Sequence, residues 1–232
     1  MKKIFVLLLA VVMSISMIAC GGGEEDIVEA EDGEAKFNFG FEVRDDFAMA
    51  EALKKIDYTD ISKQTTELEE MMAAAVKEAL PGDYPMTADY EEDDEDSIDK
   101  LAYVMAIEDD DSEKSFLETG AYHNKDDDKY YQYTVYTSDN FYDNSADNIE
   151  KTLQEISSAY GVIVSQDKVQ EAVDIILEGN PEDEEYFYYL YEDKEIKGDG
   201  YTEKITLAVE GFDTEDNTIG YYISVERERC YS

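Results

Sequence analysis

The sequence predicts an α+β fold, in which an antiparallel sheet carries amphipathic helices packed on one of its sides. Four segments repeat apolar residues at helical spacing, and seven segments are rich in β-branched and aromatic residues or alternate apolar with polar ones. Strands that follow one another through short turns pair in antiparallel fashion. Helices with a single apolar face need a core to cover, so the helices should lie against the sheet.

The helical periodicity predicts helices over residues 49–56, 61–79, 149–160 and 169–177. Asp147 and Glu150 have the spacing of a capping box for the third helix, which we expect to end at Gly161. We expect Ser165 to begin the fourth helix and Gly179 to end it.

The strand patterns predict strands over residues 36–43, 101–107, 115–122, 130–137, 186–191, 205–209 and 219–225. Residues 197–200 and 213–217 have the composition of hairpin turns. Three dense acidic runs, over residues 89–99, 108–113 and 181–185, should be solvated loops because like charges repel one another.

The order of these elements suggests a repetition along the chain. Residues 36–123 and residues 130–232 each run from a strand through two helices to further strands, with the acidic segment 124–129 as a seam. The two stretches share no clear residue identity. Two related units and one continuous α+β domain therefore both stay open.

The first 19 residues have the form of a secretory signal peptide, with two lysines, an apolar run over residues 4–19 and a small residue before Cys20. An apolar run of this length is shorter than the ~20 residues that a transmembrane helix needs. A retained membrane-spanning helix is therefore the weaker interpretation.

The segment Met17-Ile18-Ala19-Cys20 resembles the lipobox of bacterial lipoproteins, with Met17 where leucine is commonest. This resemblance implies that the Cys20 thiol receives a diacylglyceryl group and that signal peptidase II cuts before it. The protein would then be anchored to the cell membrane on its extracytoplasmic face, with residues 20–35 as an acidic, flexible tether. The alternative is a free cysteine after ordinary secretory cleavage.

The chain is strongly acidic, with 59 acidic and 19 basic residues and a net charge of −40. Such a charge repels nucleic acid, so no nucleic-acid partner is expected. The 43% hydrophobic content, with 19 Tyr and 9 Phe, is typical of a folded, soluble domain. Only Cys20 and Cys230 are present, so a lipidated Cys20 would exclude an intramolecular disulfide.

Calcium is the metal that the acidic residues suggest, because it binds several carboxylate oxygens. Asp143 and Asp147 alternate in a ligand-like way in one stretch, and Asp213 and Glu215 do so in another. Neither stretch completes an EF-hand loop, and a helix start and a hairpin turn explain them more simply. A zinc site would have to rely on His123 and Cys230, which is too few ligands of the preferred kind.

The sequence offers little support for catalysis. A nucleophile–histidine arrangement would have to use the single histidine, and no serine lies in a nucleophile elbow. A hydrolase that uses two carboxylates stays open, although an acidic chain always contains such pairs. We therefore expect a protein that is not an enzyme and needs no cofactor beyond the covalent lipid.

Tyrosines are the better indication of binding. Tyr131, Tyr133, Tyr189 and Tyr191 lie in strands that carry aromatic residues on both faces. Helices can cover one face of a sheet, and an uncovered tyrosine cluster favours recognition of a protein or glycan. The simpler alternative is that helices cover one face and that tyrosine merely suits the pleated surface of a strand. The hypothesis is a non-catalytic, lipid-anchored surface protein whose acidic, Tyr-rich domain contacts a macromolecular partner or envelope component. The alternative is an extracytoplasmic calcium-binding lipoprotein.

Overall fold

The computed structural model describes residues 27–29, 34–50, 54, 65–79, 85–92, 97–107, 116–138, 145–179, 188–214 and 218–231. Its helices are α3 (Thr65–Ala79), α4 (Ala146–Tyr160) and α5 (Gln166–Leu177). Its strands are β1 (Ile27–Glu29), β2 (Glu34–Phe37), β3 (Glu42–Val43), β4 (Met86–Glu92), β5 (Ile98–Ile107), β6 (Phe116–Asn124), β7 (Lys129–Thr137), β8 (Val162–Ile163), β9 (Tyr189–Lys197), β10 (Tyr201–Asp213) and β11 (Ile219–Tyr231).

In this part of the chain, nine strands form one sheet in the order β1-β2-β9-β10-β11-β7-β6-β5-β4, and β3 pairs with β8 separately. All neighbours in the large sheet are antiparallel except β2 and β9, which are parallel. Strands β4 to β7 and β9 to β11 each pair with their neighbours in sequence, and the turn composition of residues 197–200 agrees with the connection from β9 to β10. The α+β prediction is confirmed.

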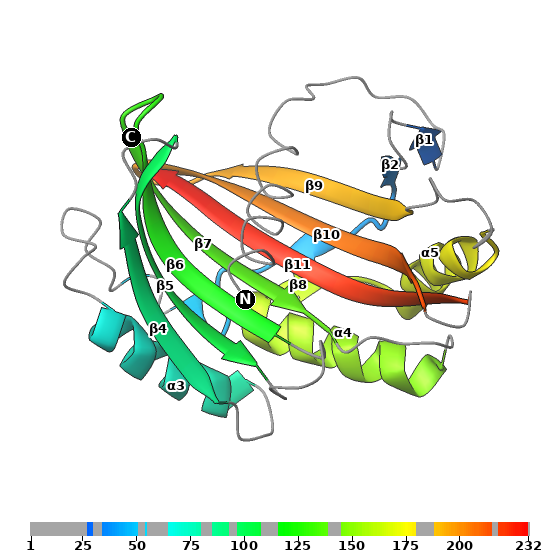
Figure 1. The fold of residues 1–232 in the computed structure, drawn as a ribbon. Coiled ribbons are helices and arrows are strands. Elements are labelled where there is room, and N and C mark those ends of the chain that lie inside the picture. The colour runs from blue at the N-terminus through cyan, green and yellow to red at the C-terminus, as the bar shows by residue number, and fades with distance from the viewer. Residues whose placement is uncertain are drawn as a thin grey trace.

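The described helices all pack on one face of the sheet. Figure 1 shows α3 and α4 below the curved sheet and α5 at its right end. The apolar stripes of these helices enter one large core cluster with alternate residues of the strands, including Leu207, Val209, Ile223 and Val225 of the two longest strands. Two smaller clusters on the opposite face consist of strand residues, so we call that side the helix-free face.

The segment predicted as a seam is the turn of a hairpin, because Asn124 of β6 pairs with Lys129 of β7. The sheet also continues from one predicted unit into the other, since β6 pairs with β7 along nine residue positions. Division of the chain into two units stays a prediction. In structural terms, the strands of both stretches build the same sheet.

Helix α4 differs from the prediction at its start and agrees with it at its end. Ser145 is the N-cap and makes no side-chain capping bond, so the capping box of Asp147 and Glu150 is wrong: Asp147 already lies inside the first turn. Gly161 ends the helix with φ +68°, a conformation that favours glycine. A Cβ there would also lie 2.6 Å from the Arg44 carbonyl oxygen.

The start of α5 matches the prediction, since the Ser165 hydroxyl accepts a hydrogen bond from the backbone N–H of Lys168. The helix ends at Leu177, with Glu178 as its C-cap. Gly179 follows directly, and its N–H donates to the Ile176 carbonyl.

Two further predictions need correction. The acidic run 89–99 is not all loop, because residues 89–92 belong to β4; this strand forms the edge of the sheet, where alternate acidic side chains reach water. The strand over 36–43 is two short strands, because Gly40 interrupts it with φ +63°. Most of the helix at 49–56, the start of the helix at 61–79, and the acidic runs 108–113 and 181–185 lie outside the described residues.

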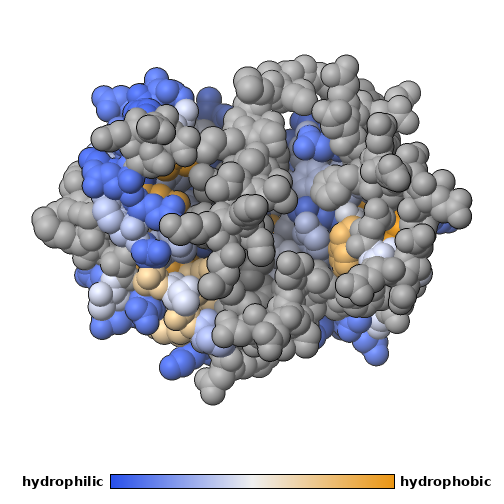
Figure 2. Space-filling model, in the orientation of Figure 1, coloured by the Kyte–Doolittle hydropathy of each residue, from blue (hydrophilic) through white to orange (hydrophobic). Residues whose placement is uncertain are grey.

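Where described residues reach the surface in the view of Figure 2, hydrophilic ones predominate and hydrophobic ones form small patches. In that part of the chain, no helix is long and apolar enough to cross a membrane.

Candidate functional site

The end of β11 alternates acid and base as Glu226, Arg227, Glu228 and Arg229. Successive side chains of a strand point to opposite faces. The two arginines therefore point toward the helices, where Arg227 reaches a backbone carbonyl of α4. The two glutamates point to the helix-free face. Because the chain has only three arginines, this placement of two of them is a marked feature.

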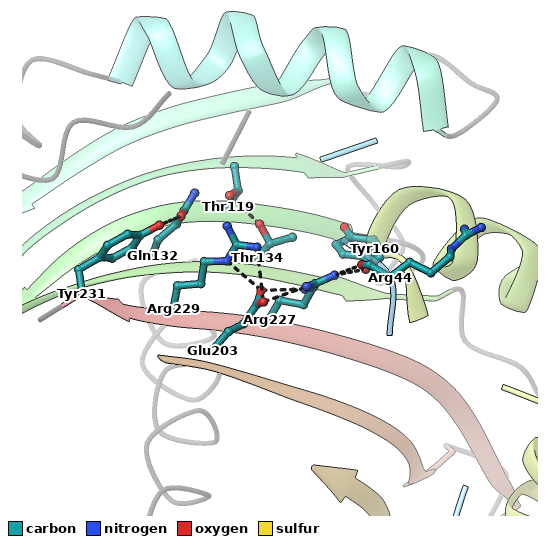
Figure 3. Close-up of polar contacts among 9 residues, drawn as sticks. All are labelled: Arg44, Thr119, Gln132, Thr134, Tyr160, Glu203, Arg227, Arg229 and Tyr231. Atoms are coloured by element: carbon teal, nitrogen blue, oxygen red, sulfur yellow. Dashed lines mark hydrogen bonds and ion pairs between the residues drawn. The ribbon is translucent and has the colours of Figure 1, made fainter. Parts of the chain in front are cut away.

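On the helix side, Arg227, Arg229 and Glu203 form what we call the arginine cluster (Figure 3). Arg227 Nε and Nη2 donate to Glu203 Oε1 and Oε2 at 2.8 and 2.9 Å, which is a bidentate pair. Arg229 shares the same carboxylate, with Nε 3.0 Å from Oε1 and Nη2 3.4 Å from Oε2. The exposed fractions of Glu203, Arg227 and Arg229 are 0%, 1% and 7%.

Arg227 also fixes the end of α4. Its Nη1 donates to the carbonyls of Tyr160 at 2.6 Å and Arg44 at 3.2 Å, and its guanidinium lies 4.0 Å from the centre of the Phe47 ring. Arg44 donates in turn to the Ser157 carbonyl at 3.0 Å. Cations at a helix C-terminus stabilise its unsatisfied carbonyls, so this contact pattern points to a structural role.

Polar side chains continue from the arginine cluster toward β6 and β7 (Figure 3). The Tyr231 hydroxyl donates to Gln132 Oε1 at 3.1 Å, and the hydroxyls of Thr119 and Thr134 lie 2.8 Å apart. Gln132, Thr119 and Thr134 are buried. The guanidinium groups of Arg227 and Arg229 stay charged at any physiological pH. The arginine cluster and the polar side chains beside it therefore form a structural network and not a site for proton transfer.

On the helix-free face, tyrosines and glutamates of β6, β7, β10 and β11 form what we call the glutamate–tyrosine face: Glu118, Tyr122, Tyr131, Tyr133, Glu210, Tyr222, Glu226 and Glu228. Three of its carboxylates accept a hydrogen bond from a tyrosine hydroxyl. The bonds join Tyr133 to Glu118 at 2.5 Å, Tyr222 to Glu210 at 2.6 Å and Tyr122 to Glu228 at 2.7 Å. The Ser224 hydroxyl also donates to Glu210 at 3.0 Å.

Gly120 makes room for the first of these bonds. A Cβ at Gly120 would lie 2.8 Å from the Tyr133 ring and 2.5 Å from the Ala102 carbonyl oxygen. Glycine is therefore required where the Tyr133 ring crosses β6 to reach Glu118.

Glu226 differs from the other three glutamates, because within the described residues its carboxylate has no hydrogen bond or ion pair. Burial raises the pKa of Glu226 to about 8, and the charge of Glu228 adds to that effect while Lys204 opposes it. Burial also raises the pKa of Glu118 and that of Glu210 to about 7, against their tyrosine hydrogen bonds. The face therefore holds acids that titrate near neutral pH.

The four candidate tyrosines all lie on the helix-free face. Tyr131 stacks on Tyr122 with ring centres 4.8 Å apart, and Tyr189 and Tyr191 lie 5.3 Å apart two strands beyond β11. Tyr133, Tyr189 and Tyr191 are buried and Tyr131 is half-buried. The structure thus places all four on one face, in two groups that β10 and β11 separate.

Elsewhere on the helix-free face, an ammonium group of the protein itself is paired between β2 and β9. Lys36 Nζ donates to Asp193 at 3.1 Å and lies 5.8 Å from the centre of the Tyr191 ring. A carboxylate and an aromatic ring are the groups that bind ammonium in many proteins. This contact joins β2 and β9, beyond the glutamate–tyrosine face.

His123 lies one residue before the end of β6, beside Asn124. Its Nδ1 lies 2.6 Å from Asp99 and its Nε2 3.3 Å from Asp128. Burial would raise the pKa of Asp99, but the hydrogen bond and charge of His123 bring that pKa below its usual value. This histidine is thus engaged by two carboxylates at a hairpin turn.

The calcium candidates do not meet in the described structure. Asp147 is exposed in the first turn of α4 and Asp213 is the last residue of β10, whereas Asp143 and Glu215 lie outside the described residues. Within those residues, no group of three or more histidine, cysteine or acidic side chains is arranged to hold a metal. Cys230 is a half-buried free thiol in β11, and Cys20 lies outside the description.

Sequence reasoning missed the arginine cluster and the glutamates that lie on the helix-free face. The signal was present: the apolar alternation of β11 continues past Val225 as alternating charge, and arginine is rare in this chain. A charged residue in the apolar register of a strand indicates a buried ion pair.

In comparisons with protein-family models, curated proteins and solved structures, no match to this chain was found.

Proposed function

We propose that this protein is a non-catalytic lipoprotein, anchored by Cys20 on the extracytoplasmic side of the cell membrane, that contacts a macromolecular partner through the glutamate–tyrosine face. The resemblance of Met17–Cys20 to a lipobox supports the anchor. Binding at the sheet is supported by the chemistry of its helix-free face.

The observation that carries the proposal is the gathering of tyrosines and glutamates on the face that the described helices leave uncovered. Tyrosine rings provide large apolar contact area with a polar tip, which suits recognition of proteins and glycans. Along β11 the residues of this face, from Tyr222 to Cys230, are half-buried, so they keep part of their surface accessible. The opposite face is filled by the core and the arginine cluster.

Site-specific photo-crosslinking in intact cells tests the binding surface. A benzophenone amino acid at Tyr131 or Tyr222 should give one discrete crosslinked product, and the same group at Glu171 of α5 should not. Glu171 is the matched control because it is half-exposed on the helix side of the molecule. Equal products from all three positions, or products from Glu171 alone, would contradict the proposal.

The anchor has its own test, independent of the partner. Cys20→Ala should move the protein from the membrane fraction to the medium or periplasm, because two acyl chains are needed for stable anchoring. A variant that stays in the membrane fraction at unchanged size would show that Cys20 does not carry the anchor.

A further inference from the structure

We infer that Arg229 is the centre of a binding site for a carboxylate group that is attached to an apolar body. The site lies on the helix side of the sheet, at the end of the arginine cluster that is farther from α4 (Figure 3). The glutamate–tyrosine face is on the opposite side of the sheet, so this second site does not depend on the proposed function.

The first observation is the charge balance of the arginine cluster. Two guanidinium groups share one carboxylate, that of Glu203, so two positive charges and one negative charge leave a net charge of +1. All three residues are at most 7% exposed. Charged groups that are removed from water need partners of opposite charge, and one monovalent anion would complete the pairing.

The second, independent observation is a buried nitrogen of Arg229 that has no hydrogen-bond acceptor. Nε lies 3.0 Å from Glu203 Oε1, but its N–H is not directed at that oxygen, so this donor is unsatisfied. Nη2 donates to Glu203 Oε2 at the long distance of 3.4 Å, and Nη1 makes no hydrogen bond within the described residues. A buried donor without an acceptor in a native fold indicates a bound water or ion.

The two arginines of β11 differ in their surroundings. Every nitrogen of Arg227 has a partner, and its Nη1 donates to the carbonyl of Tyr160, the last residue of α4. Side chains two positions apart on a strand are separated by about 7 Å, and Arg229 lies on the side of Arg227 away from Tyr160 (Figure 3). The side chain of Arg229 is 9% exposed and that of Arg227 is 0% exposed. The incompletely paired arginine is therefore the one that reaches the surface.

Two tyrosines lie beside the guanidinium of Arg229. This group is 4.7 Å from the centre of the Tyr201 ring, and the rings of Tyr201 and Tyr231 are 5.9 Å apart. The two tyrosines face each other in the register of β10 and β11. Both are half-buried, so they present apolar surface next to the unsatisfied nitrogen.

The chemistry of the site favours a carboxylate over a phosphate. One negative charge balances the net charge of +1, whereas a phosphate group carries close to two charges at neutral pH. Guanidinium groups bind carboxylates through charge-assisted hydrogen bonds, and the tyrosine rings would pack against an apolar group attached to the carboxylate. The net charge of −40 on the chain repels anions, but salt screens charges beyond ~8 Å at physiological ionic strength.

Calorimetric titration of the full-length protein tests the inference. The probes are benzoate and benzamide, which have the same ring and differ in charge. Benzoate should bind the wild type, and benzamide should bind about tenfold more weakly or less. Arg229→Gln should weaken benzoate binding by about tenfold, because it removes the excess positive charge. Lys151→Gln removes the same charge from α4, where the side chain is 61% exposed, and should change binding by less than about twofold.

Equal binding of benzoate and benzamide would overturn the inference, because the negative charge would then not be recognised. Equal weakening by Arg229→Gln and Lys151→Gln would overturn it as well, since the effect would come from the overall charge of the protein. A wild type that does not bind benzoate would leave Glu203, Arg227 and Arg229 as a purely structural triad.

A measurement on the wild type keeps the test valid if Arg229→Gln fails to fold. Benzoate at about ten times its Kd should raise the thermal unfolding midpoint by about 3–5 °C, and benzamide at the same concentration should not. Inorganic phosphate at that concentration should give a smaller rise than benzoate. A rise with phosphate that equals or exceeds the rise with benzoate would contradict the assignment of a carboxylate.

Such a carboxylate can belong to a free organic acid or to the C-terminus of a peptide. The dipeptide N-acetylalanyl-phenylalanine and its C-terminal amide distinguish these sources in the same titration. Tighter binding of the dipeptide than of benzoate would assign a peptide C-terminus as the occupant, and tighter binding of benzoate would assign a small organic acid. Equal binding of the dipeptide and its amide, together with equal binding of benzoate and benzamide, would exclude both.

Discussion

The two faces of β11 carry opposite charges, and they differ in how completely those charges are paired. On the helix side, Arg227 and Arg229 share the buried carboxylate of Glu203, and Arg227 has a partner for each of its nitrogens. On the helix-free side, Glu226 and Glu228 lie among tyrosines and further glutamates, and burial raises the pKa of both. The paired charges of the arginine cluster stabilise the fold. The carboxylates of Glu226 and Glu228 are less completely neutralised, so a positively charged group could stabilise them.

Glu203→Gln should have the largest effect, because it leaves two buried guanidinium groups without their counter-charge. We expect the free energy of unfolding to fall by about 3–5 kcal/mol, measured by urea denaturation. The control is Glu195→Gln, an exposed position on β9, which should change stability by less than about 0.5 kcal/mol. A loss below about 1 kcal/mol for Glu203→Gln would mean that the arginine cluster contributes little.

Tyr133→Phe tests the opposite face, because it removes the hydroxyl that donates to the buried Glu118. Glu118 has a folded pKa of about 7, above its unfolded value, so the protonated acid is favourable to the fold below the unfolded pKa, and this contribution is lost as pH rises through 7. At pH 8 the buried carboxylate is charged and depends on the Tyr133 hydroxyl, whereas at pH 5 it is protonated and depends on that donor less. We therefore expect a cost of about 1–3 kcal/mol at pH 8 and a smaller one at pH 5.

Tyr231→Phe is the matched control for that measurement. It removes a hydroxyl that donates to the neutral amide of Gln132 on the helix side. Its cost should be about 1 kcal/mol and independent of pH between 5 and 8. The same pH dependence in both variants would show that Glu118 does not titrate in this range.

Glu226→Gln should stabilise the folded protein, opposite in sign to Glu203→Gln. The folded pKa of about 8 lies above the unfolded value, so the wild type loses stability as pH rises toward and through 8. The variant lacks this loss and should be more stable by about 1 kcal/mol at pH 9, with little difference at pH 5. Glu226→Asp keeps the charge and should not show the gain. The measurement is the thermal unfolding midpoint of wild type and variants at pH 5 and pH 9. A Glu226→Gln midpoint no higher than that of the wild type at pH 9 would contradict the raised pKa of Glu226.

Asp99→Asn should have the smallest effect, a few tenths of a kcal/mol at pH 7, since Asp99 is partly exposed. The folded pKa of Asp99 is below its unfolded value, so its contribution is present above the unfolded pKa and is lost as pH falls through the folded one. Asp128→Asn, at an almost fully exposed partner of the same histidine, should have no measurable effect. An effect of Asp99→Asn that persists at pH 2.5 would rule out the ion pair as its cause.

Much of the fold followed from local patterns in the sequence. The helices at Ile149 and Val169 and the strands around Leu207 and Ile223 appear where the periodicity predicts them. The edge strand β4 was missed because its acidic residues are typical of a loop. At a sheet edge, one side of the strand meets water, so charge there does not prevent pairing.

The candidate site was less predictable. Sequence reasoning selected Tyr131, Tyr133, Tyr189 and Tyr191, and the structure places all four on the helix-free face, but their function stays a prediction. Nothing in the local sequence indicated that Glu118, Glu210 and Glu228 would each accept a bond from a tyrosine of another strand. These partners are 12 to 106 residues apart in sequence, so only strand pairing brings them together.

By itself, the sequence determined most of the longer elements, the acidic character and the resemblance of Met17–Cys20 to a lipobox, because periodicity, charge and short motifs are local properties. Tertiary structure alone decided which charges are paired. The alternation of Glu226, Arg227, Glu228 and Arg229 sends neighbouring residues to opposite faces. Their partners come from distant strands whose order and register depend on packing of the whole sheet. That packing gave the arginines a buried counter-ion and left Glu226 without a partner among the described residues.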